Sequence, residues 1–111
     1  MYVDKKLVIS QTQVDEFCQL VNDTNVIHKP EYENPVVPGM LTTSLIFEKP
    51  GDHWRLAKMD IRYSDVVFIG KEVEYRYELL TEKSKVKKYL VSVKQFDRLC
   101  LEAEILLVRK I

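Results

Sequence analysis

Asp23, Asn25 and His28 lie close together in a stretch rich in turn-forming residues. A carboxylate and an imidazole can together take a proton from water and return one to carbon, since histidine titrates near neutral pH. Aspartate and asparagine also cap and turn chains by bonding nearby backbone groups, and a histidine before Lys-Pro is an ordinary loop residue. From these residues alone, a catalytic and a structural interpretation both stay open.

The elements that must position these residues begin with a predicted helix. Lys6 to Ser10 reads as a short strand, and Ser10 with Gln13 forms an S-x-x-Q capping box that starts the helix. The helix should run to about Val21. Helical spacing predicts one buried stripe, formed by Val14, Phe17, Cys18 and Val21 with Leu20 beside them.

A long loop is predicted from Asn22 to Pro38. It carries three prolines and three asparagines, residue types that favour turns over regular ladders. Long loops inside compact domains tend to be functional, because a rigid scaffold can aim their polar side chains at a ligand. The chemistry of this protein is therefore expected here first.

A second helix, from Gly39 to Glu48, is apolar or small nearly all the way round. The Lys49-Pro50-Gly51 sequence should stop it. A helix of this composition is predicted to be buried at the centre of the fold.

Four strands are predicted to follow and, with the first short strand, to wrap this helix in antiparallel order. Residues 55–65 alternate Met59, Ile61 and Tyr63, and residues 72–79 alternate apolar with charged side chains. Residues 87–96 and 99–108 should form a hairpin joined through Asp97-Arg98, and a glycine turn is expected in FIGKE. The predicted fold class is α+β, as a single domain over residues 1–111.

Composition excludes several classes of function. The 17 basic residues match the 17 acidic ones, so no net charge favours nucleic acid or anionic lipid. No segment has the roughly 20 apolar residues of a membrane span, and we expect a cytoplasmic protein. Cys18 and Cys100 lie far apart without metal-ligand spacing, which predicts buried free thiols and neither a disulfide nor a zinc site. We expect no cofactor.

Three motifs resemble those of the MaoC-like dehydratases and (R)-specific enoyl-CoA hydratases, which have the hotdog fold. The segment F-C-Q-L-V-N-D-T-N-V-I-H, from Phe17 to His28, resembles an aromatic residue followed by G-D-x-N-P-[aliphatic]-H. V-V-P-G-M-L-T-T-S-L resembles I-V-H-G-M-L-x-x-S-L, and S-D-V-V-F-I-G-K-E-V is similar to a strand end P-V-x-x-G-D-x-V. The resemblance covers nearly the whole chain.

The resemblance implies a sheet wrapped round one helix and a homodimer or dimer of dimers with substrate at its interface. It implies that Asp23 and His28 hold the water that adds to an acyl-thioester double bond, supported by Asn25. Gly39, with Met40, would offer backbone N–H groups to the thioester oxygen. The substrate would be an acyl-CoA or an acyl-carrier-protein thioester.

Three positions depart from the family pattern: Asn22 replaces its glycine, Val26 its proline, and Pro38 the histidine before the helix glycine. Two alternatives therefore stay open. One is an acyl-CoA thioesterase, which uses a carboxylate on the central helix, where Glu48 stands at the end. The other is a non-catalytic acyl-binding or partner subunit, which is favoured by Pro38 and by the segment between His28 and Pro35, several residues shorter than the corresponding loop of the family.

Overall fold

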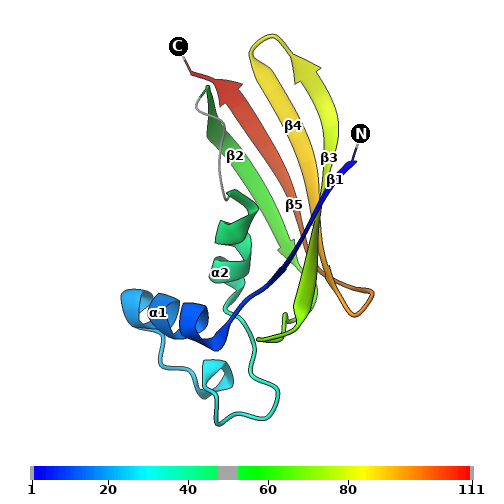
Figure 1. Ribbon diagram of the computed structural model, residues 1–111. Helices are drawn as coiled ribbons and strands as arrows, with labels where there is room; N and C mark the ends of the chain where they lie inside the picture. The colour runs from blue at the N-terminus through cyan, green and yellow to red at the C-terminus, as the bar shows by residue number, and fades with distance from the viewer. Residues whose placement is uncertain (1, 48–52, 111) are drawn as a thin grey trace.

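A five-stranded antiparallel sheet forms the body of the protein in a computed structural model that describes residues 2–47 and 53–110 (Figure 1). The strand order is β1-β3-β4-β5-β2. The strands are β1 (Tyr2–Val8), β2 (Trp54–Tyr63), β3 (Glu72–Lys83), β4 (Val86–Gln95) and β5 (Arg98–Arg109). Helix α2 lies beside this sheet, and α1 lies at the end of the molecule opposite the two described chain ends.

Alternating residues give the central strands one buried face. On β3, Val73 and Tyr75 are buried while Glu72 and Arg76 are exposed, as their alternation predicts. The edge strand β2 departs from the prediction, because Tyr63 is half exposed. A strand that pairs on one side only has fewer neighbours to cover its side chains.

The two predicted turns are present, one of them shifted by a residue. Phe96 and Asp97 have φ of 54° and 58° and join Gln95 to its partner Arg98. Two consecutive residues with positive φ make the type I′ turn that suits the strand twist, so the turn is Phe96-Asp97 and not Asp97-Arg98. The glycine turn before β3 uses Gly70, whose φ is 80°.

Helix α1 (Gln11–Val21) begins and ends as predicted. The Ser10 side chain accepts from the Gln13 N–H, and the Gln13 side chain accepts from the Ser10 N–H, which completes the capping box. The predicted buried stripe is narrower than expected, because Val21 is exposed along with Leu20. The strand before it is β1, which ends at Val8 and leaves Ser10 free to act as the cap.

The central helix is shorter than predicted. Helix α2 spans Gly39–Ser44 and tightens into the 3₁₀ turn η2 (Leu45–Phe47), while Glu48 lies outside the described residues. The Thr43 hydroxyl donates to the Gly39 carbonyl at 3.0 Å, and the Ser44 hydroxyl donates to the Leu41 carbonyl at 2.8 Å. Hydroxyls that bond the preceding turn compete with regular helix, which accounts for the early end.

Side chains from the sheet donate hydrogen bonds to carbonyl groups of α2 and η2. The Tyr75 hydroxyl donates to the Thr42 carbonyl at 2.7 Å, and the Tyr77 hydroxyl to the Ile46 carbonyl at 2.9 Å. Lys5 on β1 donates to the Leu45 carbonyl at 2.7 Å. The helix is buried on its sheet side only, since Met40 on its outer side is 63% exposed. None of the described helices is long and apolar enough to cross a membrane.

Candidate active site

Asp23 projects from the end of α1. The Asp23 N–H donates to the Cys18 carbonyl at 2.8 Å, and the Asn22 N–H donates to the same oxygen. Asn22 has φ of 58°, in the left-handed region where glycine is the usual residue and asparagine is tolerated. Asn22 thus adopts a left-handed conformation that glycine, the residue at this position in the hydratase motif, adopts without strain.

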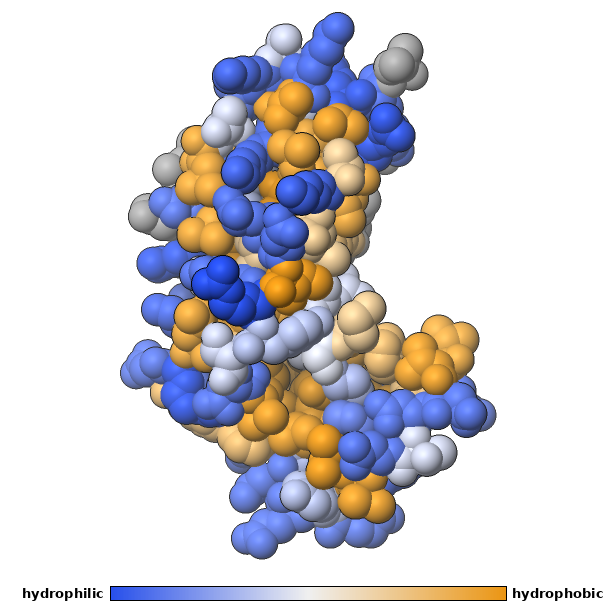
Figure 2. All heavy atoms as spheres, turned by 180° about the vertical axis from the view of Figure 1, so that it is seen from behind, coloured by the Kyte–Doolittle hydropathy of each residue, from blue (hydrophilic) through white to orange (hydrophobic). Residues whose placement is uncertain are grey.

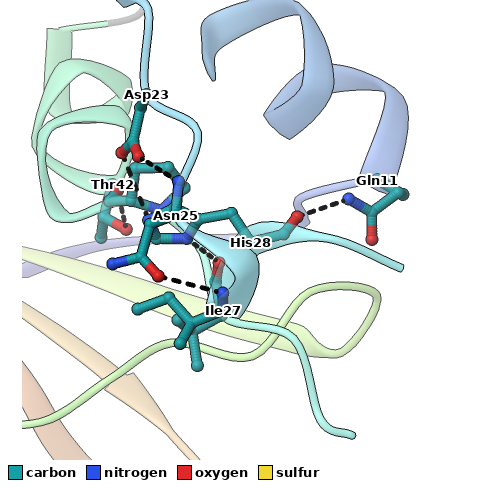
Figure 3. Close-up of polar contacts among 8 residues, drawn as sticks. Gln11, Asp23, Asn25, Ile27, His28 and Thr42 are labelled. Carbon is teal, nitrogen blue, oxygen red and sulfur yellow. Dashed lines mark hydrogen bonds and ion pairs between the residues drawn. The ribbon is translucent and has the colours of Figure 1, made fainter. Parts of the chain in front are cut away.

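Asn25 builds the short 3₁₀ helix η1 (Val26–His28) that carries the histidine. Its side-chain oxygen accepts from the Ile27 N–H at 3.2 Å, and its own N–H donates to Asp23 Oδ1 at 3.0 Å (Figure 3). Asn25 therefore caps η1 and also orients the Asp23 carboxylate.

His28 is held at both ring nitrogens. Nδ1 lies 2.6 Å from the Val36 carbonyl oxygen, and Nε2 lies 3.3 Å from Asp23 Oδ2. The side chain of His28 is 9% exposed and that of Asp23 is 32% exposed, so the carboxylate is the more accessible partner. Gln11 of α1 also donates to the His28 carbonyl, at 2.8 Å (Figure 3).

The Val36 carbonyl decides which nitrogen of His28 carries the proton. A carbonyl oxygen only accepts, so Nδ1 must be the donor in this contact. In the neutral ring, Nε2 then has a lone pair that faces the Asp23 carboxylate, which is also an acceptor. Such a pair is satisfied by a proton on Nε2 or by a water that donates to both groups.

Gly39 lies at the exposed start of α2, near this pair along the chain. Two residues lie between Val36 and Gly39, which keeps their Cα atoms within about 11 Å. Gly39 and Thr42 line a cavity of about 270 Å³. Asp23 and His28 contact each other, but neither of them lines this cavity.

Tyr63 is a residue of this region that sequence reasoning did not single out for chemistry. It lines the same cavity, and its hydroxyl lies 2.7 Å from Thr43 Oγ1. Its ring atom Cε1 lies 3.0 Å from the position that a Cβ on Gly39 would occupy. No sequence motif around Tyr63 predicts these contacts with Thr43 and Gly39, because they depend on how β2 packs against α2.

The two cysteines are buried and free, as predicted. Burial raises the pKa of the Cys18 thiol, and the nearby charge of Asp23 adds to that effect. Burial likewise raises the pKa of the Cys100 thiol. In residues 2–47 and 53–110, no grouping of His, Cys, Asp and Glu side chains could hold a metal ion.

Comparison with known proteins identifies the fold. No protein-family model matches the sequence, and no curated protein matches it significantly. An (R)-hydratase from A. caviae involved in PHA biosynthesis has a TM-score of 0.80 at 21% identity, over 96% of this chain and 92% of its own. R-hydratase PhaJ1 from Pseudomonas aeruginosa has a TM-score of 0.82 at 16% identity, over 98% of this chain and 79% of its own.

A mutant of the fluoroacetyl-CoA-specific thioesterase FlK is also similar. Its TM-score is 0.73 at 10% identity, over 99% of this chain and 85% of its own. The architecture is therefore the hotdog fold, an antiparallel sheet curved round one short helix, and the predicted α+β class is confirmed.

Proposed function

We propose that this chain belongs to the MaoC-like hydratases and dehydratases and adds water reversibly to trans-2-enoyl thioesters. The product would be the (R)-3-hydroxyacyl thioester, a stereochemistry that rests on the resemblance alone. The observation that carries the proposal is the contact of His28 Nε2 with Asp23 Oδ2 at 3.3 Å, with Nδ1 anchored on Val36. An anchored imidazole beside a carboxylate is a suitable acid–base pair.

The pair would work on one water molecule. This water donates one hydrogen bond to the Asp23 carboxylate and one to the Nε2 lone pair of His28. The water oxygen bonds to C3 of the enoyl group, and the water gives one proton to the Asp23–His28 pair. The pair then delivers a proton to C2. The pair is regenerated, and hydroxyl and hydrogen have added to one face of the substrate.

Gly39 and Met40 would stabilise the charge that develops on the thioester oxygen. The first N–H groups of a helix have no acceptor within the helix, and Pro38 provides no side-chain cap. Fixed N–H donors stabilise a developing oxyanion without reorganisation. The exposed position of Gly39 supports access to these groups, and the adjoining cavity would accept part of the acyl group.

The carrier of the substrate would be coenzyme A or an acyl-carrier protein. The (R)-hydratases and the fluoroacetyl-CoA-specific thioesterase with the same fold support a thioester as the ligand class. Thioester hydrolysis is the weaker candidate, since residues 39–47, which form α2 and η2, contain no carboxylate.

We also propose that two copies of the chain associate as a homodimer, or as a dimer of dimers. β1 and β2 form the two edges of the sheet. Edge strands have unpaired backbone groups that favour pairing with another strand. The surface seen in Figure 2 mixes apolar and charged side chains. Leu56 and Tyr63 on β2 and Met40 on α2 are among the exposed apolar side chains.

A spectrophotometric screen of short enoyl-CoA and saturated acyl-CoA thioesters tests this function. We expect loss of the enoyl absorbance without release of free thiol. Thiol release from either substrate would identify a thioesterase instead. Binding of both thioesters without any turnover would indicate a non-catalytic acyl-binding subunit. Pro38→His would then be the first substitution to test.

A further inference from the structure

Gln95, at the end of β4, is a fully buried amide in the part of the chain that the structure describes. It is 1% exposed and uses both ends of its side chain. Oε1 accepts from the Phe68 N–H at 2.7 Å, and Nε2 donates to the carbonyl groups of Phe68 at 3.1 Å and Lys71 at 3.2 Å. Burial of an amide is unfavourable unless it is hydrogen-bonded, so this side chain has one stable position.

Gln95 bonds the segment of residues 65–71, and the centre of this segment pairs with residues 35–37, which precede Gly39. Phe68 forms an antiparallel bridge with Val36. On either side of the bridge, the Val37 N–H donates to the Val67 carbonyl at 2.7 Å, and the Ile69 N–H donates to the Pro35 carbonyl at 3.0 Å. A displacement of Phe68 would therefore displace Val36.

Val36 is the residue that orients the histidine. Its carbonyl accepts from His28 Nδ1 at 2.6 Å, and its N–H donates to the Ile27 carbonyl at 2.8 Å. The path from Gln95 to the His28 ring thus has three links: amide to Phe68, Phe68 to Val36, and Val36 to Nδ1. The first and last links are hydrogen bonds, and the middle link is the antiparallel bridge, whose hydrogen bonds join the neighbouring residues Val37 to Val67 and Ile69 to Pro35.

We propose that Gln95 is a positioning residue for His28. By fixing Phe68, it fixes the Val36 carbonyl, which keeps the proton on Nδ1 and leaves the Nε2 lone pair facing Asp23. An apolar side chain of the same length would fill the core equally well but would leave the Phe68 segment without these bonds.

The segment has other attachments, so the loss of Gln95 should shift it without unfolding it. Arg98 forms an ion pair with Asp65 and donates to the Val66 carbonyl at 3.4 Å. The Gly70 N–H donates to the Ile9 carbonyl at 2.9 Å. These contacts hold residues 65–70 near both ends, while Gln95 bonds the segment at Phe68 and at the Lys71 carbonyl.

The test is ¹⁵N NMR of protein labelled at histidine, because the chain has only two histidines. His53 is exposed and lies on the chain next to β2, so it serves as an internal reference. In the wild type we expect His28 to be the Nδ1–H tautomer when neutral. In Gln95→Met we expect a measurable share of the Nε2–H tautomer at His28 and an unchanged His53.

A matched control separates positioning from general loss of stability. Tyr77→Phe removes a hydrogen bond to the Ile46 carbonyl, which is not on the path to Val36. It should leave the His28 tautomer as in the wild type. If Gln95→Met does not fold, Gln95→Asn takes its place, since it keeps the amide but is one methylene too short. A folded Gln95 variant with the wild-type His28 tautomer would overturn the proposal.

A kinetic arm rests on the proposed function and is kept separate from the NMR result. If the wild type hydrates enoyl-CoA, Gln95→Met should lower kcat by about 10-fold to 100-fold, because small misplacements of a catalytic group are costly. KM should change little, and Tyr77→Phe should retain wild-type kcat. An inactive wild type would contradict the hydratase function alone, because the tautomer shift does not require turnover.

Discussion

His28 has an acceptor at each ring nitrogen, and the two acceptors differ in kind. The Val36 carbonyl is fixed in the backbone, whereas the Asp23 carboxylate is partly exposed and able to meet a ligand. The contact between Asp23 and His28 could be anticipated from the motif that contains both. The carbonyl that selects the tautomer could not, because it depends on the path of a backbone eight residues further along.

The ring of Tyr63 lies close to Gly39 and leaves little room for a side chain there. A Cβ at Gly39 would lie 3.0 Å from Tyr63 Cε1, so the ring would have to move. We expect Gly39→Ala to be less favourable in the wild type than in a Tyr63→Ala background, by roughly 0.5 kcal/mol or more in unfolding free energy. Urea denaturation of the four proteins measures this coupling. Equal effects of Gly39→Ala in both backgrounds would refute it.

At the scale of elements, α2 depends on the sheet more than on its own sequence. Residues 42–44 are Thr-Thr-Ser, and β-branched and hydroxyl residues form helix weakly. The tyrosine hydroxyls from β3 bond the carbonyl groups of this helix and so stabilise it where it ends. Propensity alone therefore did not locate the end of the helix.

We expect Tyr75→Phe to lower the unfolding free energy by about 1–3 kcal/mol, because it removes a buried hydrogen bond and leaves the Thr42 carbonyl without that donor. Tyr77→Phe, at a partly buried position, should cost less. Chemical denaturation of both variants gives the comparison. A larger loss for Tyr77→Phe would show that the helix is held mainly at its far end.

Local patterns were sufficient for some elements and not for others. The capping box located the start of α1, and alternation located the buried face of β3. β2 was harder, because the burial of an edge strand depends on what lies beside it. The loop from Asn22 to Pro38 was predicted from its composition, but its bridge from Val36 to Phe68 joins residues more than thirty positions apart.

At the scale of the whole molecule, the sheet ends in two edges, and the proposed homodimer would cover at least one of them. We expect sedimentation at micromolar concentration to give at least twice the 13.1 kDa mass of one chain. A species of one chain mass across that range would rule out the dimer. It would also remove the subunit interface as the place where substrate binds.

The most direct test of the account is the rate of enoyl-CoA hydration by the wild type, Asp23→Asn, His28→Ala and the double variant. Asp23→Asn keeps the shape of the side chain and removes its charge, and His28→Ala removes the imidazole. We predict that each single change lowers kcat/KM by about 10² to 10⁴. Because both groups act on one water, the double variant should be little worse than the poorer single. Hydration by both single variants at the wild-type rate would contradict the central claim, since the activity would then come from other groups.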